Sequence, residues 1–470
     1  MKNFIYPLLA ILIIPHFFIL SSCANIIPPT GGPRDSLPPV LISALPKDST
    51  VNFKDNKITL TFDEYVQLDN NLNEELIVSP NPEKIPVIEG KLRTVTIRLK
   101  DSLRPNTTYA FNFGKALKDV NENNALKNFT YVFSTGPTLD EGMITGNVKL
   151  AETGEVDSQL LVVLHRNLND SAVKKLKADY YTRLDSSGNF RFTYLPLEKF
   201  SIYVLPNDYT KKYDDSTKMF AFFDSTVEAS AAPKVVQLYA YQEFLLTTPP
   251  PTSTSSNSNN NKKKPDEDKR LKYTTNLESN EQNLLDSLKF IFNRPATKFD
   301  SSLVLLSDTN YHPITNYRIL QADTTARKFA IIYPWTENQF FTLIIGKEAF
   351  TDSSGITLSK ADTLNFKTRR EGQYGSIRLH FNNLDLNKNP VLQLVQNKVI
   401  VQSIILTGKE WYQKLIEPGQ YQLRILFDEN KNGIWDPGNF NERRQPEKVQ
   451  NIPRQITIKS NWDNEVDINL

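Results

Sequence analysis

The sequence predicts an all-β protein made of β-sandwich domains in tandem, preceded by a signal peptide. Aromatic residues make up 11% of the chain, with 27 Phe and 19 Tyr, and this bias favours folded strands over disorder. Apolar and polar residues alternate with a period of two in several short runs. A length of 470 residues exceeds what one hydrophobic core needs and corresponds to roughly three to four domains.

The alternating runs define the expected strands. Ile58, Leu60 and Phe62 alternate with Thr59 and Thr61, which places the apolar side chains on one face of a strand. The same alternation recurs at residues 95–99, 109–113 and 129–133. Segments rich in Pro, Asn, Asp and Gly separate the runs at the spacing typical of sandwiches.

The chain also contains a long internal repeat. The run "LTFDEYVQLDN" at Leu60–Asn70 has a counterpart in "FIFNRPATKFD" at Phe290–Asp300. The run "FGKALKDVNENNAL" from Phe113 matches "IGKEAFTDSSGITL" from Ile345. A unit of about 230 residues therefore occurs twice, and each unit is interpreted as two domains. This pattern predicts four sandwiches strung in series as a rod.

Composition marks the boundaries between the expected segments. The run Thr247–Arg270, "TTPPPTSTSSNSNNNKKKPDEDKR", is polar and of low complexity and cannot bury a core. The predicted segments are a signal peptide over 1–22, a Pro/Gly-rich tether over 23–39, sandwiches over 40–137 and 138–246, a disordered linker over 247–275, and sandwiches over 276–370 and 371–470.

The N-terminus has the features of an export signal. Lys2 precedes an apolar run from Phe4 to Leu20, which is short for a membrane-spanning helix and is interrupted by prolines. The small residues before Cys23 resemble the bacterial lipobox, in which the cysteine is diacylated and becomes the new N-terminus. The resemblance implies a membrane partner held through lipid at Cys23. The alternative is an ordinary signal peptide followed by an incidental cysteine.

The residues after the lipobox bear on location. Ala24 follows Cys23, whereas an aspartate there would resemble an inner-membrane retention signal. No acidic cluster of the kind that marks surface export in some lipoproteins follows. We expect the chain to lie on the periplasmic face of the outer membrane, with surface exposure as the alternative.

Composition disfavours several function classes. The 55 Lys and Arg balance 53 Asp and Glu, so a nucleic-acid partner is not expected. A single cysteine rules out an intramolecular disulfide and a thiolate metal cluster. The four histidines belong to no HExxH or Cys/His motif, and no Ser/His/Asp constellation is visible. We therefore expect no enzyme. A glycoside hydrolase, whose acids need not be near in sequence, is the least favoured alternative.

The first domain of each repeat resembles the SbsA-type bacterial Ig-like domain. The residues that carry the resemblance are "ITLTFDEYV" (Ile58–Val66), "LRPNTTYAFNF" (Leu103–Phe113) and "FTYVFSTG" (Phe129–Gly136), with "LKFIFNRPA" (Leu288–Ala296), "ENQFFTLIIG" (Glu337–Gly346) and "LNFKTRREG" (Leu364–Gly372) in the second copy. The family implies a seven-stranded sandwich used as a spacer or adhesive module. It carries no catalytic residues.

The second domain of the first repeat resembles the carboxypeptidase-regulatory or transthyretin-like sandwich. The resemblance rests on "GMITGNV" (Gly142–Val148) and "RLDSSGNFRFTYLPLEKFSIYV" (Arg183–Val204). Lys199 replaces a glycine expected before the last strand, whereas the second copy keeps that glycine in "EPGQYQLRIL" (Glu417–Leu426). Such modules are not catalytic.

One loop has the spacing of a metal site. In "DENKNGIWDPGN", Asp428, Asn430, Asn432, Ile434 and Asp436 occupy positions 1, 3, 5, 7 and 9, with Gly433 at position 6. This resembles a calcium loop of the EF-hand or dockerin type, in which alternating oxygen ligands wrap the ion. Asn439 replaces the bidentate Glu at position 12, and the alternative is a long hairpin tip. Calcium is the only cofactor considered.

These observations leave two principal functions open. The first is a structural or protein-binding module that engages other envelope proteins. The second is a carbohydrate-binding component, for which Trp335, Trp411, Trp435 and Trp462 are candidate platform residues if they cluster on the surface. Core or hinge packing is the ordinary role of such tryptophans.

Overall fold

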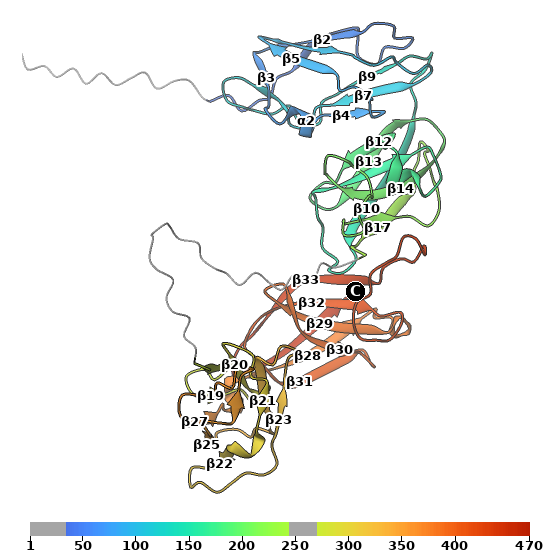
Figure 1. Cartoon of the computed structure of the whole chain (residues 1–470). Coiled ribbons are helices and arrows are strands. Elements are labelled where there is room, and N and C mark those ends of the chain that lie inside the picture. Colours follow the sequence, from blue (N-terminus) through green and yellow to red (C-terminus); the bar gives the residue numbers. More distant parts are fainter. Residues whose placement is uncertain (1–33, 244–269) are drawn as a thin grey trace, which may run out of the picture.

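The computed structural model describes residues 34–243 and 270–470, and this part of the chain is almost entirely β-structure (Figure 1). Helix among these residues is limited to single turns, which are α2 (Leu72–Glu75), α3 (Ala172–Lys175), η1 (Ser301–Leu303), η2 (Glu371–Gln373) and η3 (Leu386–Lys388). The predicted class, tandem β-sandwiches, is confirmed.

The first sandwich packs a four-stranded sheet, β1-β2-β6-β5, against the sheet β4-β7-β9. Ile58, Leu60 and Phe62 on β2 are completely buried between the sheets, whereas the intervening threonines face outward. The expected alternation is therefore observed. The strands are β1 (Leu41–Leu45), β2 (Lys57–Phe62), β3 (Val66–Leu68), β4 (Ile77–Ser79), β5 (Val87–Lys91), β6 (Thr94–Arg98), β7 (Thr108–Asn112), β8 (Leu117–Asp119) and β9 (Thr130–Ser134).

The second sandwich packs the sheet β13-β10-β17 against the sheet β12-β11-β14-β15. β10 and β17 run parallel, and the other pairs are antiparallel. The strands are β10 (Gly142–Leu150), β11 (Leu160–His165), β12 (Tyr180–Arg183), β13 (Asn189–Leu195), β14 (Lys199–Pro206), β15 (Ala221–Phe222), β16 (Val227–Glu228) and β17 (Val235–Ala240).

The third sandwich packs the sheet β18-β20-β24-β23 against the sheet β19-β27-β25-β22. Its core contains seven buried aromatic side chains, of which Phe290 and Phe350 are completely buried. The strands are β18 (Tyr273–Thr275), β19 (Glu281–Gln282), β20 (Leu288–Phe292), β21 (Lys298–Phe299), β22 (Val304–Ser307), β23 (Arg318–Gln321), β24 (Lys328–Ile332), β25 (Phe340–Ile345), β26 (Phe350–Thr351) and β27 (Asp362–Thr368).

The fourth sandwich packs the sheet β31-β28-β34 against the sheet β30-β29-β32-β33. β28 and β34 run parallel. The strands are β28 (Gly375–Asn382), β29 (Pro390–Gln396), β30 (Val399–Ile405), β31 (Glu410–Ile416), β32 (Gly419–Phe427), β33 (Lys448–Ile458) and β34 (Asp463–Asn469).

The internal repeat is visible in the topology. The order β1-β2-β6-β5 in the first sandwich corresponds to β18-β20-β24-β23 in the third. The parallel pair β10·β17 of the second sandwich corresponds to β28·β34 of the fourth. The two halves of the chain therefore share one arrangement of strands, although their side chains differ.

Two expectations about organisation are wrong. The linker predicted to reach residue 275 ends earlier, because Leu271 is buried in the third core and β18 begins at Tyr273. The sandwiches are also not arranged in chain order. The fourth sandwich lies against the second, and the third lies at the far end (Figure 1). The cause is the loop 428–447, which binds the second sandwich.

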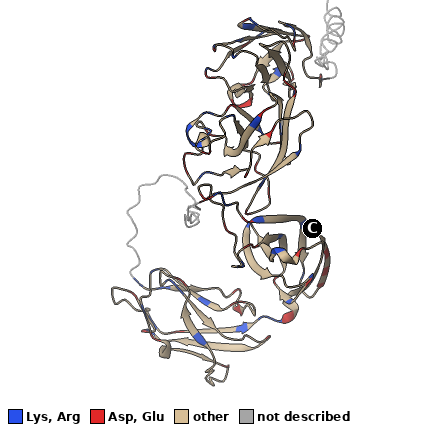
Figure 2. Ribbon diagram, turned by 90° about the vertical axis from the view of Figure 1, so that its right-hand side faces the viewer, with Lys and Arg blue, Asp and Glu red and all other residues tan. Residues whose placement is uncertain are grey.

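Charge is distributed evenly over the molecule. Lys and Arg are interspersed with Asp and Glu in all four sandwiches, and the described residues form no large region of one sign (Figure 2). Within residues 34–243 and 270–470, no helix has the length and apolar character needed to cross a bilayer.

Candidate functional site: the interface of the second and fourth sandwiches

The loop 428–447 connects β32 to β33 and inserts an aromatic side chain into the second sandwich. Phe440 is 3% exposed. Its ring centroid lies 4.9 Å from that of Phe220, 5.2 Å from Phe222, 5.9 Å from Tyr203 and 6.0 Å from Tyr213. All four partners belong to the second sandwich, so the aromatic cluster is shared between two domains that are distant in sequence.

Polar contacts surround the inserted ring. The Arg443 guanidinium lies 2.7 Å from a carboxylate oxygen of Asp170. The Gln445 amide donates to the Asp224 carboxylate at 2.8 Å. The Phe440 backbone N–H donates to the Glu243 carboxylate at 2.6 Å. These bonds fix the orientation of the loop on the second sandwich.

The strands on either side of the loop make a second group of contacts. The Val449 N–H donates to the Ala151 carbonyl at 2.9 Å. The Arg424 guanidinium lies 3.0 Å from a Glu155 carboxylate oxygen, and its side chain is 5% exposed. Removal of the Glu155 carboxylate from the docked structure would leave the shielded Arg424 charge unpaired, which is costly.

The predicted calcium-loop residues lie at the base of this same loop. Asp428 is 1% exposed, and its carboxylate accepts three backbone N–H bonds. The side-chain amides of Asn430 and Asn432 each donate to the Asp436 carboxylate at 2.7 Å. Ile434 is 64% exposed. The predicted ligand residues therefore gather in one turn, where side-chain hydrogen bonds hold them.

Glu447 joins this group and was not identified from the sequence. It is 5% exposed and accepts N–H bonds from Glu429 at 2.8 Å and from Asp436 at 3.0 Å. Burial raises the pKa of its carboxyl, and the negative charges of Asp428 and Asp436 raise the pKa further, against those two hydrogen bonds. Glu447 stands outside any twelve-residue loop pattern, so spacing carried no signal for it.

Within the described part of the chain, no group of three or more His, Cys, Asp or Glu side chains is placed to hold a metal ion. Calcium binding through Asp428, Asn430, Asn432, Ile434 and Asp436 stays a prediction. Cys23, the predicted lipidation site, lies outside the described residues.

The four tryptophans do not share one surface. Trp335 is 8% exposed in the third core, and Trp411 packs against the fourth core. Trp435 packs at the shared interface and donates its indole N–H to the Glu447 carbonyl at 2.8 Å. Trp462, by contrast, is 62% exposed. The platform considered from the sequence is therefore not formed by these residues.

The histidines are also dispersed. His165 is 1% exposed in the second sandwich, and burial lowers its pKa. His312 contacts Asp308 at 2.9 Å in the third sandwich. His380 in the fourth contacts Glu465 at 2.7 Å, and this hydrogen bond raises its pKa. The fold does not bring these side chains together.

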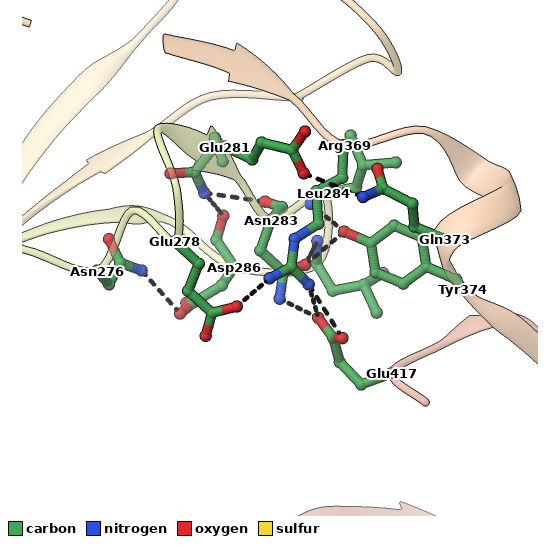
Figure 3. Close-up of polar contacts among 12 residues, drawn as sticks. Asn276, Glu278, Glu281, Asn283, Leu284, Asp286, Arg369, Gln373, Tyr374 and Glu417 are labelled. Carbon is green, nitrogen blue, oxygen red and sulfur yellow. Dashed lines mark hydrogen bonds and ion pairs between the residues drawn. The ribbon is translucent and has the colours of Figure 1, made fainter. Parts of the chain in front are cut away.

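A second junction joins the third and fourth sandwiches through a polar network (Figure 3). Arg369 pairs with Glu417 at 3.2 Å and also with Glu278. The Tyr374 hydroxyl accepts the Leu284 N–H at 2.8 Å and bonds the Asn283 side chain at 2.9 Å. Because the network spans both domains, it restricts their relative orientation.

The first and second sandwiches meet through bonds to backbone groups. The Asn81 N–H donates to the Asp179 carbonyl at 2.7 Å. The Arg183 guanidinium donates to the Glu75 carbonyl at 2.8 Å. All three junctions therefore consist of specific contacts.

Comparisons with known proteins bear on the first sandwich. Residues 35–135 match the bacterial Ig-like domain family, which confirms the Ig-like interpretation of this domain. A search of curated protein sequences finds no match.

Several solved structures align with the chain at low similarity. The Bacillus anthracis TIE protein is 10% identical over 94% of this chain and 75% of its own, with a TM-score of 0.18. BcpA, the major pilin subunit of Bacillus cereus, is 12% identical over 70% of this chain and 99% of its own, with a TM-score of 0.17. The N-terminal part of the bacterial S-layer protein SbsC is 13% identical over 42% of this chain and 44% of its own, with a TM-score of 0.16. Alignments at this level carry no inference about function.

Proposed function

We propose that the chain is a non-catalytic lipoprotein of the bacterial envelope, in which four β-sandwiches form a structural or protein-binding scaffold. The observation that carries the proposal is the set of three built junctions, above all the insertion of Phe440 into the second sandwich. An Ig-like first domain fits a structural or adhesion-type module. A scaffold that holds partners at fixed separations needs domains whose relative orientation is restricted.

The lipid anchor rests on the residues around Cys23. Diacylation would hold the chain at the outer membrane through buried acyl chains, and the segment that follows would act as a spacer. The periplasmic face is the proposed location. Other envelope proteins or glycans are the proposed partners.

The test of anchoring compares wild-type protein with a Cys23→Ser variant. Metabolic labelling with a clickable fatty acid should mark the wild type only, and flotation gradients should place only the wild type with outer-membrane vesicles. Equal labelling of the two proteins would contradict lipidation at Cys23. A protein with a Ser22→Ala change, which keeps a small residue before the cysteine, is the matched control and should be labelled like the wild type.

The test of the scaffold role is cross-linking in intact cells followed by mass spectrometry. We expect cross-links from the exposed strands of the sandwiches to a small, reproducible set of envelope proteins, with loss of these cross-links in the Cys23→Ser variant. A chain that cross-links only to itself under these conditions would count against a protein-binding scaffold.

A further inference from the structure

The docked second and fourth sandwiches enclose a groove of about 810 Å³. Its walls come from β10 and β17 on one side and from β33, the end of β32 and the η3 turn on the other. Ligand sites of about 300–1,000 Å³ at domain interfaces are common in proteins. The groove borders the junction described above, because Val449 both lines it and donates its backbone N–H to the Ala151 carbonyl, and it exists only while the two domains are docked.

Cations and aromatic rings alternate across the groove. Lys149 and Tyr239 are register partners on β10 and β17, and the Lys448 ammonium lies 4.9 Å from the Tyr239 ring centroid. Lys448 is in turn the register partner of Phe427, and the Lys388 ammonium lies 5.6 Å from the Phe427 centroid. Three positive charges and two rings thus form one row through both domains.

The three ammonium groups are available to a ligand. Lys149, Lys388 and Lys448 are exposed, and none of them forms an ion pair with any carboxylate in residues 34–243 or 270–470. The lining contains a single acid, Glu429, so the groove carries a net positive charge. Lysines placed together without acidic partners repel one another, and a bound anion removes that repulsion.

Amide side chains complete the lining. Asn387, Asn389, Gln450 and Asn451 border the row of lysines and rings. Amides both donate and accept, which suits hydroxyl groups, and the lysines suit carboxylate or phosphate groups. Aromatic rings pack against the C–H faces of sugars. The combination matches an acidic saccharide.

We propose that this groove binds an acidic saccharide, a glycan whose sugar units carry carboxylate or phosphate groups. Nucleic acid also combines rings with anions, but the chain has a net charge of only +2, and residues 34–243 and 270–470 show no broad basic region of the kind found in nucleic-acid-binding proteins (Figure 2). The inference goes beyond the scaffold role. Saccharide binding is measured on purified protein without the lipid. A negative result would therefore not bear on lipidation at Cys23, and a failed lipidation test would not bear on saccharide binding.

The test is calorimetric titration of the full mature chain in the Cys23→Ser form. The probes are a short oligogalacturonate, a phosphorylated oligomannose, the carboxyl-reduced neutral counterpart of the oligogalacturonate, and single-stranded oligothymidylate. At least one acidic saccharide should bind, with an affinity that falls as salt is added. The neutral saccharide should bind at least about tenfold more weakly, because it loses hydrogen bonds to charged groups.

Variants identify the groove as the site. The double variant Lys388→Gln/Lys448→Gln should weaken acidic-saccharide binding by at least about tenfold. Lys459→Gln, an exposed lysine of the same sandwich outside the groove, is the matched control and should bind like the unmodified chain. Unchanged thermal unfolding of both variants shows that the fold is intact.

Four outcomes would overturn the proposal. The first is that neither acidic saccharide binds, and the second is that the neutral saccharide binds as tightly as the acidic one. The third is that oligothymidylate binds more tightly than both acidic saccharides, and the fourth is that the double lysine variant binds the acidic saccharide as tightly as the unmodified chain.

Discussion

At the residue scale, the Asp428 carboxylate is the central acceptor of the turn that was predicted to bind calcium. Burial is the main cause of the raised pKa of Glu447, and the charges of Asp428 and Asp436 raise it further. A bound cation would offset the repulsion among these three carboxylates. An extracellular-type affinity of about 10⁻⁴–10⁻³ M is expected, because Asn439 supplies no bidentate carboxylate. At about ten times the Kd, mass action gives about 1.4 kcal/mol of stabilisation.

We therefore expect the Tm of the mature chain to rise when millimolar calcium is added. Asp428→Ala should abolish the rise, and so should Asp428→Asn, which keeps an oxygen acceptor for the turn. Glu442→Gln changes an exposed acid of the same loop outside the spacing and should preserve the rise. A Tm of the unmodified chain that does not change with calcium would contradict calcium binding and would leave the loop a hydrogen-bonded turn without a metal.

His165 predicts a pH dependence of stability. Its imidazole is buried edge-on to Tyr203, and neither ring nitrogen has a hydrogen-bond partner among the described residues. Burial holds its pKa below the ordinary value of 6.5, so the folded imidazole stays neutral where the unfolded one is protonated. The unfolded state then binds more protons below about pH 6.5, and the free energy of unfolding falls as the pH falls.

The check is urea unfolding at about pH 7.5 and about pH 5.5, on either side of the ordinary imidazole pKa. His165→Phe should unfold with a smaller difference between the two conditions than the wild type, because the variant has no group to protonate there. His312→Gln, at an exposed position, should retain the wild-type difference. If His165→Phe keeps the full difference, the buried imidazole is not its source.

At the scale of elements, two corresponding loops have different roles. The loop after β14 stays within the second sandwich, where Tyr213 stacks on Phe220 with centroids 3.9 Å apart. The corresponding loop after β32 reaches out and places Phe440 against both rings. The later loop thus uses the aromatic surface built by the earlier one.

Phe440→Ala should release the fourth sandwich from the second. Truncation of a buried Phe costs about 3–5 kcal/mol, which is large for an interface inside one chain. We expect a larger radius of gyration in small-angle X-ray scattering and faster proteolysis at residues 441–445. Ile434→Ala, at an exposed position of the same loop, is the control and should leave both measurements unchanged. An unchanged radius of gyration for Phe440→Ala would contradict a docking role for this ring.

At the scale of the whole molecule, we expect the docked interface of the second and fourth sandwiches to hold the two halves together even when the covalent linker is cut. The composition of Thr247–Arg270 predicts that a protease cleaves there first. The resulting N-terminal and C-terminal halves should co-elute in gel filtration, because the second and fourth sandwiches still bind each other through the Phe440 cluster.

The same digestion of Phe440→Ala should give halves that elute separately. First cleavage inside a sandwich would contradict the linker prediction. Separate elution of the wild-type halves would show instead that the interface is too weak to hold them without the linker.

Local sequence determined the elements of this protein. Alternation at Ile58, Leu60 and Phe62 predicted a strand with one buried face, because a strand exposes its side chains with a period of two whatever surrounds it. The repeat predicted paired domains, and the shared strand order agrees with it. The spacing from Asp428 to Asp436 predicted a calcium loop, with a hairpin tip as the alternative. The structure gathers these side chains in one hydrogen-bonded turn, because Asx turns form between close neighbours, and calcium binding stays a prediction.

Only the tertiary structure decided how the domains meet. Phe440 lies in a polar loop, and its sequence neighbours give no indication that its ring is buried. The ring packs against Phe220, which is more than two hundred residues earlier in the sequence. Glu447 and the row from Lys149 to Lys388 are likewise assembled from separate strands and domains. Contacts between distant segments depend on how well two folded surfaces fit each other. The hydrophobic periodicity of a single segment contains no information about that fit.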